Sequence, residues 1–334
     1  MRQKRLIIAD AGYYHCVNRV RGQNALFADD AAKRKLKRLI DRVSAFSGVE
    51  IKTFALMDDH FHLLVKVPQK RDVGDEELDT RMRSLYGDEK TNTLLASWEL
   101  WAAKGEQVKV DAAKAALRKR MFNLSDFFKT LKERYSKDFN RNHDCSGTFW
   151  SERFKSILLE PGSVILTTLG TYIDLNPVRA GKTEKPEDYE YCGIGAAVRG
   201  DKSAREGIRE IVSPSPALSD KRIEFDDALK IYKQVMEGEN PVNAFASVKR
   251  KFVPGTNLKT ETTEQVQNAA KLREKRREFI EGAVLGTLGF IAKFVLDIMV
   301  TASHLGRYSY KPWSDKSYAE FYHACRINRI NRRP

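Results

Sequence analysis

Two kinds of hydrophobic pattern alternate over the first two hundred residues of the chain. Short runs rich in β-branched and aromatic residues predict strands, and longer stretches with apolar residues three and four positions apart predict helices. Acidic residues, glycine and proline mark several of the boundaries between them. The predicted strands span residues 13–20, 49–57, 60–67 and about 153–160, and the predicted helices span residues 29–47, 112–122, 125–140 and 163–176.

The order of these elements indicates the fold class. A strand, a helix, two strands joined by a tight turn at Met57-Asp58-Asp59, a helix, a strand and a helix fit an antiparallel sheet with helices on one face. We therefore expect an α+β domain whose core closes near residue 192. The remainder of the chain has helical character, so we also expect a helical C-terminal region.

Differences in composition divide the chain further. Residues 69–124 are largely polar and mixed in charge, which predicts a partly helical insertion within a first domain of residues 1–198. Residues 199–222 are polar and contain two prolines, as is typical of a linker. Residues 223–334 then form the basic C-terminal region, with auxiliary DNA binding as one interpretation.

One largely apolar segment, Gly282 to Val300, raises the question of a membrane span. Lys293 and Asp297 interrupt it and its apolar residues recur at helical spacing, which favours a buried amphipathic helix. The first ten residues lack the apolar stretch of a signal peptide. The four cysteines are far apart, which excludes a disulfide framework or a zinc ribbon. We expect a cytoplasmic protein without a membrane segment.

The charge balance indicates a partner. The 334 residues carry a formal net charge of +14 with a pI of about 9.5, which favours a polyanion such as nucleic acid, although some soluble proteins are simply basic. Residues 265–334 hold 13 Lys and Arg against 6 Asp and Glu, densest over residues 271–277. This run is either a solvated helix face or a nonspecific contact to DNA.

His60-Phe61-His62 is the first motif that carries chemistry. Alternation along a strand places both imidazoles on one face and Phe61 on the other, so the pair can chelate one metal ion. Apolar neighbours on both sides would make the strand a rigid support. Paired histidines on a strand are also often ordinary polar residues, and the motif alone does not separate these alternatives.

The second motif runs from Thr171 to Gly181. Tyr172 and Asn176 are one helical turn apart on the same face, and the amide oxygen of Asn176 suits a hard cation. Two imidazoles and one amide oxygen would leave positions for phosphate oxygens and water, with Tyr172 beside the phosphate. The alternative is that Tyr172 packs in the core and Asn176 caps the helix end.

Together these motifs resemble one family, the REP-associated tyrosine transposases, which are HUH endonucleases with a single catalytic tyrosine. The resemblance covers approximately residues 5 to 192, and its blocks fall in the family's order. The blocks are Tyr14-His15-Cys16-Val17-Asn18-Arg19 with Arg21-Gly22, Leu56-Met57-Asp58-Asp59-His60-Phe61-His62-Leu63-Leu64, Phe139-Asn140-Arg141, Gly147-Thr148-Phe149-Trp150 with Arg153-Phe154, and Tyr172-Ile173 with Asn176-Pro177-Val178-Arg179-Ala180-Gly181.

The resemblance implies a function and assigns roles. His60 and His62 match the metal ligands, Asn176 matches the position of a third ligand, and Tyr172 matches the nucleophile. The implied fold is a ferredoxin-like antiparallel sheet, and the implied metal is Mg²⁺ or Mn²⁺. The implied activity is DNA transposition by cleavage and joining of single-stranded DNA that carries palindromic hairpins. The oligomeric state, monomer or homodimer, stays open.

The chain departs from the family pattern in two places. Asp58-Asp59 stands where the family commonly has Pro-Asn before the first histidine, so two acids lie beside the predicted metal. The stretch 69–124 is longer than the resemblance predicts between the histidine strand and the next helix. Both departures bear on how metal and DNA are placed.

Contacts to DNA are predicted beside the matched motifs. Cationic side chains there suit phosphates, and Trp150 and Phe149 suit stacking on unpaired bases. The alternatives are a solvated surface for the cations and core packing for the aromatics. A non-catalytic DNA-binding regulator and a replication initiator or relaxase are the competing functions. The predicted cations are Arg19, Arg21, Arg153, Lys155 and Arg179.

Overall fold

The computed structural model describes most of the N-terminal two thirds of the chain and short parts of the remainder. The described residues are 11–23, 25–213, 223–239, 244, 282–287, 308–312 and 321–326. The basic run at residues 271–277 lies outside them.

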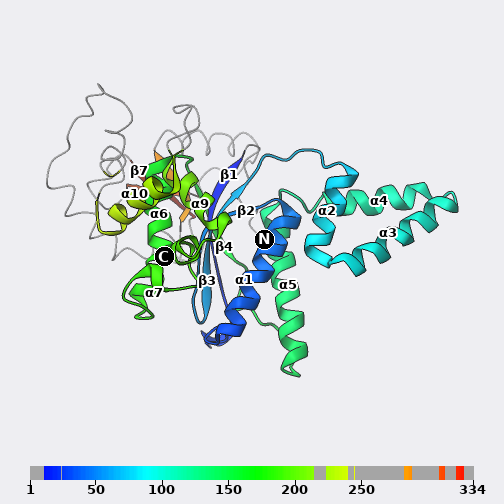
Figure 1. Ribbon diagram of the computed structural model, residues 1–334, viewed down its shortest axis with the longest axis horizontal. Coiled ribbons are helices and arrows are strands. Elements are labelled where there is room, and N and C mark those ends of the chain that lie inside the picture. The colour runs from blue at the N-terminus through cyan, green and yellow to red at the C-terminus, as the bar shows by residue number, and fades with distance from the viewer. Residues whose placement is uncertain are drawn as a thin grey trace, which may run out of the picture.

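An antiparallel sheet forms the centre of the fold (Figure 1). Its strands are β1 (Gly12–Arg19), β2 (Glu50–Leu56), β3 (His60–Val67) and β4 (Lys155–Leu159), in the spatial order β2-β3-β1-β4. Each neighbouring pair is antiparallel, and β2 and β3 form a hairpin around the predicted turn. The predicted α+β class with an antiparallel sheet is confirmed, and the predicted strands agree with the observed ones to within about two residues.

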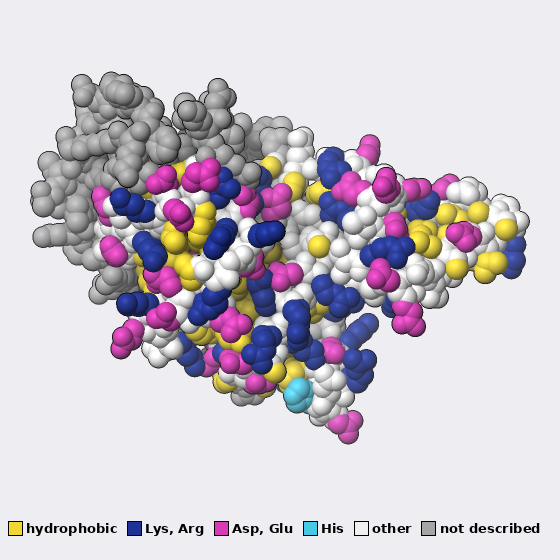
Figure 2. Space-filling view, viewed as in Figure 1, with side chains coloured by type: hydrophobic (Ala, Val, Ile, Leu, Met, Phe, Trp, Pro, Cys, Tyr) yellow, Lys and Arg dark blue, Asp and Glu magenta, His cyan; other side chains and the backbone are white. Residues whose placement is uncertain are grey.

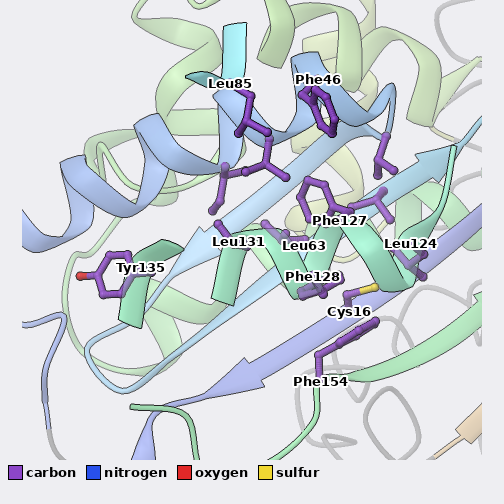
Figure 3. Packing of buried hydrophobic residues seen from close by; sticks show 14 of the residues in the cluster. Cys16, Phe46, Leu63, Leu85, Leu124, Phe127, Phe128, Leu131, Tyr135 and Phe154 are labelled. Atoms are coloured by element: carbon purple, nitrogen blue, oxygen red, sulfur yellow. The ribbon is translucent and has the colours of Figure 1, made fainter. Parts of the chain in front are cut away.

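One face of the sheet is covered by α1 (Asp30–Ser47) and α5 (Leu124–Asn142). Both helices present an apolar stripe, and side chains of α5 such as Phe127, Phe128 and Leu131 point toward the strands beside Leu63 (Figure 3). Asp29 caps α1. Asn123, two residues before the predicted start of the helix, caps α5, because its side chain accepts from two backbone N–H groups.

Helices also cover the opposite face, whereas the sequence predicted helices on one face. There α6 (Ser163–Asp174) packs against β2 and β3, α9 (Lys202–Val212) packs against β2, and α10 (Phe225–Met236) packs on α6 and α9. The reason is visible in β3, where Leu63 and Leu64 are both fully buried although they point to opposite faces. A strand that is apolar on both sides requires cover on both sides.

The insertion after β3 is a helical arm that projects from the side of the domain (Figure 1). It consists of α2 (Asp75–Tyr86), α3 (Asp88–Ala103) and α4 (Gln107–Arg118), so it is more helical than predicted. Figure 2 shows apolar side chains on the arm, where Leu100 and Val108 are 63% and 81% exposed.

Two predictions for the later part of the chain were wrong. Residues 202–212 of the predicted linker form α9, whose Ala204, Ile208, Ile211 and Val212 make a buried stripe among polar residues. An apolar stripe with helical spacing predicts a helix packed on the core, even when the segment is polar overall.

The second error concerns part of the predicted helical C-terminal region, which is helical at α10 but not in the three segments described after it. The described residues there include three strands, β5 (Gly282–Thr287), β6 (Tyr308–Pro312) and β7 (Phe321–Arg326). They extend the sheet beyond β4 in the order β5-β7-β6, and β5 runs parallel to β4. A short apolar run cannot be assigned to helix or strand from its period alone, and glycines at 282 and 286 disfavour a helix. The short helices α7 (Asn176–Arg179) and α8 (Gly193–Val198) complete the described fold.

A partly buried ion cluster joins α9 to the sheet. Glu210 accepts hydrogen bonds from Tyr13 at 2.5 Å, from Lys66 at 2.8 Å and from Lys52, which is itself nearly buried. Burial alone would raise the pKa of Glu210, but the charge and hydrogen bond of Lys52, with those of its other partners, outweigh burial and lower the pKa to about 2.

We expect Glu210→Gln to lower the free energy of unfolding at pH 7 by about 2–3 kcal/mol. Because the folded-state pKa lies below the unfolded value, this stabilisation is complete above pH 4.5 and is lost as the pH falls toward 2. Urea unfolding of both proteins at pH 7 and pH 3 measures it. Glu206→Gln on the same helix, which removes a partly exposed carboxylate, is the control. A difference that does not shrink at pH 3 would contradict the account.

Candidate active site

His60 and His62 lie on the same face of β3. They are two residues apart on a regular strand, so their side chains project together toward the side covered by α6. Their ring centroids are 5.1 Å apart. The predicted pairing of the two imidazoles on one face therefore agrees with the structure.

Asp59 holds the first imidazole. Its Oδ1 lies 2.5 Å from Nδ1 of His60, and its Oδ2 accepts a hydrogen bond from Arg19 at 2.6 Å. The hydrogen bond with His60 lowers the pKa of Asp59, and the charges of His60 and Arg19 act in the same direction against burial. Asp58 points elsewhere and pairs with Lys182 and Lys33. Of the two acids that depart from the family pattern, one orients a predicted ligand and the other anchors the turn.

The second imidazole is buried against a third one. His62 is 2% exposed, and its Nδ1 lies 3.0 Å from Nε2 of His15. The two rings stack at an interplanar angle of 11°. Burial lowers the pKa of His62 well below its usual value, and the neighbouring His15 and His60 add to this effect. His62 is therefore neutral at physiological pH, which is the form of imidazole that binds metal ions.

Tyr172 meets this histidine group from α6. Its ring centroid lies 6.3 Å from that of His62 and 6.4 Å from that of His15, edge-on in both cases. The guanidinium of Arg179 lies over the same ring, 4.5 Å from the centroid, and donates a hydrogen bond to the backbone carbonyl of Tyr172. The tyrosine from the late helix and the histidines of the central strand thus occupy one site. The side chain is only 4% exposed.

Asn176 is placed at the junction of α6 and α7. Its Nδ2 donates to the carbonyl oxygens of Tyr172 and Ile173, at 3.0 and 3.1 Å. This is the capping role that the sequence left open as an alternative. The amide oxygen is not used in these two bonds, so capping and a ligand role are compatible.

A cavity of about 100 Å³ opens beside the two histidines of β3. A volume of this size corresponds to roughly three water molecules. Its remaining side is formed by the end of β1 and by the segment that leads into β4. The lining residues are Val17, Asn18, Arg19, His60, His62, Glu152, Arg153 and Lys155.

The donor set suits a divalent cation completed by substrate. Within the described ranges, no group of three or more His, Cys, Asp or Glu side chains is arranged to hold a metal ion. His60 and His62 supply two nitrogens, and each has its Nδ1 engaged by a protein partner, which leaves Nε2 for an ion. Such a site needs further oxygen ligands, which the amide of Asn176, phosphate and water would supply.

The predicted DNA contacts divide into two groups. Arg19, Arg153 and Lys155 line the cavity, Arg179 lies on the ring of Tyr172, and Arg21 is exposed at the end of β1. These positions suit phosphates near the site.

Trp150 and Phe149, the residues predicted to stack on bases, lie in the core of this structure. Trp150 is 8% exposed and its indole N–H donates to the carbonyl of Lys132, while Phe149 packs against it and against Tyr135 and Phe27. Both belong to the aromatic core under α5, which was the alternative interpretation.

His15 is the site residue that the sequence did not assign. It lies in the first matched block, but its contact with His62 depends on the pairing of β1 with β3, where Val17 faces His62 and His15 lies two residues farther on the same face. Only the register of two separate strands reveals it.

Comparisons with known proteins agree with the predicted family for the N-terminal segment. Residues 9–75, which include β1, α1, β2 and β3, match the protein-family model described as "Transposase IS200 like". The match confirms the transposase resemblance over these residues, and it includes His15, His60 and His62 but not Tyr172.

One solved structure similar to this chain is titled "Structure of the REP associates tyrosine transposase bound to a REP hairpin". It shares 13% sequence identity with a TM-score of 0.39, and the match covers 60% of this chain and 87% of that chain. No curated protein matches the chain. Among the residues that the structure describes, no helix has the length and apolar character needed to cross a membrane.

Proposed function

We propose, from the premise that residues 9–75 are those of an IS200-like transposase, that this chain cuts and rejoins single-stranded DNA with Tyr172 as nucleophile. The observation that carries the proposal is the placement of the Tyr172 ring beside His62, 6.3 Å between centroids, on the face of β3 that also bears His60. A phenol beside two imidazoles that share one face of a strand supports phosphoryl transfer over a purely structural cluster.

The proposed cleavage step forms one bond and breaks one. The phenolic oxygen of Tyr172 attacks the scissile phosphorus and the phosphorus bond to the 3′ oxygen breaks. The phenolic proton passes to solvent, and the departing 3′ oxygen takes up one proton from water. The products are a 5′-phosphotyrosine and a strand that ends in a free 3′-OH. Because the phosphodiester energy is kept in the covalent link, a second 3′-OH can reverse the step and join strands.

The proposed Mg²⁺ or Mn²⁺, held by His60, His62 and Asn176, would neutralise phosphate charge and orient the ester. The chain's own cations contribute around it. Arg179 lies over the Tyr172 ring and places a positive charge beside the proposed nucleophile. Arg153 and Lys155, at the cavity, are placed to hold phosphate oxygens.

The proposed substrate is single-stranded DNA that carries a palindromic hairpin. This follows from the resemblance of the block from Tyr172 to Gly181 to the REP-associated branch. The net charge of +14 supports a polyanionic partner of this kind.

The test uses the full chain and a pool of single strands, each with a hairpin and randomised flanks, labelled at either end. With Mn²⁺ present, we expect the 3′ segment to remain attached to the protein on a denaturing gel and the 5′ segment to be released with a free 3′-OH. EDTA should abolish both products. An adduct that forms equally well in EDTA would contradict the metal-dependent mechanism.

One observation favours a second candidate, a non-catalytic DNA-binding regulator. Tyr172 is 4% exposed, so a phosphate can reach its hydroxyl only if the neighbouring segments move. Tight binding to hairpin strands with no adduct from any member of the pool would support this alternative.

A further inference from the structure

His15 contributes a third imidazole to the candidate active site, and the proposed chemistry does not yet use it. The residue is 1% exposed, and its Nε2 lies 3.0 Å from Nδ1 of His62. The two rings stack with their centroids 5.2 Å apart, and the ring of Tyr172 lies edge-on at 6.4 Å. His15 therefore contacts the predicted metal ligand His62 at Nδ1, and the predicted metal-binding nitrogen of His62 is the other one, Nε2.

The contact between the two imidazoles has two proton arrangements. If His62 carries its proton on Nδ1, it donates to Nε2 of His15, and the lone pair on Nε2 of His62 remains for a cation. If His15 donates instead, the proton of the neutral His62 ring sits on Nε2, and that nitrogen cannot bind a cation. The direction of one hydrogen bond thus decides whether His62 is a ligand.

We propose that His15 is a positioning residue, which accepts the Nδ1 proton of His62 and thereby presents Nε2 of His62 to the cavity as a metal-binding nitrogen. This inference rests on the proposed function. The two predicted ligands would then be held in the same way, because Asp59 also contacts Nδ1 of His60, at 2.5 Å. Ligand histidines commonly have their second nitrogen held by such a partner.

The burial of each ligand explains why the two partners differ. The side chain of His60 is 19% exposed, and its partner Asp59 is also paired with Arg19, so a carboxylate is tolerated there. His62 is 2% exposed, where an additional carboxylate would be a buried charge with a large desolvation cost. A neutral imidazole supplies an acceptor without that charge, and its flat ring fixes the plane of His62 by stacking.

The test compares two variants of the full chain by Mn²⁺ binding, followed by electron paramagnetic resonance. His15→Phe keeps an aromatic ring against His62 but removes the acceptor. His15→Gln removes the ring but places an amide oxygen near the position of Nε2. We expect His15→Phe to weaken Mn²⁺ binding about 10- to 100-fold and His15→Gln to stay close to the wild type.

The opposite order would overturn the proposal, because a role in packing alone is kept by phenylalanine and lost with glutamine. A second measurement does not depend on the variants folding: ¹⁵N–¹H NMR of the metal-free wild type should show the proton of His62 on Nδ1, and a proton on Nε2 would overturn the inference. Mn²⁺ binding by the wild type that His15→Phe leaves unchanged would overturn this inference alone. A wild type that binds no Mn²⁺ would overturn the proposed function as well.

Discussion

Tyr172→Phe is expected to abolish the covalent protein–DNA adduct while leaving binding to hairpin strands intact. The substitution removes only the oxygen that attacks phosphorus, and loss of a nucleophile lowers turnover by on the order of 10⁶-fold, which is below detection on a gel. Binding should persist because phenylalanine keeps the ring that packs against His15, His62 and Arg179. The measurements are adduct formation on a denaturing gel and binding by fluorescence anisotropy.

Tyr13→Phe is the matched control. Tyr13 lies on β1, on the same face as His15, but its hydroxyl bonds to Glu210 rather than facing the histidine pair. This variant loses a partly buried hydroxyl and should still form the adduct. An adduct that survives in Tyr172→Phe would show that another group attacks the phosphate.

The second large effect concerns a buried carboxylate that anchors the end of α6. Asp174 is fully buried, and it accepts hydrogen bonds from Tyr232 at 2.6 Å, from Thr53 at 2.9 Å and from the backbone N–H of Ile194 at 3.2 Å. Residues from β2, α8 and α10 therefore meet on the helix that carries Tyr172. Gly193 packs against them so closely that a Cβ there would lie 1.8 Å from the Thr53 hydroxyl oxygen.

Burial raises the pKa of Asp174 to about 6, although its hydrogen bonds act in the opposite direction. Between pH 4 and pH 6 the folded chain therefore holds a proton that the unfolded chain has released. The free energy of unfolding falls as the pH rises through this window, by about 3 kcal/mol for a shift of this size. We expect Asp174→Asn, which cannot ionise, to remove this component.

The measurement is urea unfolding in EDTA at pH 4 and pH 7. The stability of the wild type relative to Asp174→Asn should fall by about 3 kcal/mol between the two values. Asp226→Asn, at an exposed position of α10, controls for the loss of a carboxylate as such. Asp174→Ala should be less stable than Asp174→Asn at both pH values, because it leaves buried donors without an acceptor. If the free energy of unfolding changed equally between pH 4 and pH 7 in the wild type and in Asp174→Asn, the explanation by a buried charge would be refuted.

The sequence predicted well those features that depend on short-range periodicity. His60 and His62 share a face because a strand alternates, and Tyr172 and Asn176 share one because a helix repeats every 3.6 residues. The histidine pair and the tyrosine were brought into one site by the resemblance, and the ring contacts of Tyr172 with His62 agree with it.

Features that depend on tertiary pairing were not predictable in this way. The contact of His15 with His62 follows from the register of β1 against β3, and the burial of Trp150 follows from the packing of α5 on the sheet. The segment that forms α9 was predicted to be a linker because it is polar overall. It forms a helix packed on the sheet because Ile208 and Ile211 belong to one apolar stripe. For Gly282–Thr287, the period of the apolar run does not separate helix from strand, and pairing with β4 adds to the two glycines in favouring a strand.

The parallel pairing of β5 with β4 has a consequence for any shortened form of the chain. The backbone N–H of Glu160, just after β4, donates to the carbonyl of Leu285. Three residues after Glu160, α6 begins, and this helix carries Tyr172. Without β5, β4 would become an edge strand with unpaired backbone amide and carbonyl groups. Such an edge can pair with a strand of another molecule. A fragment of the first two hundred residues would therefore expose an aggregation-prone sheet edge close to α6, the helix that carries Tyr172.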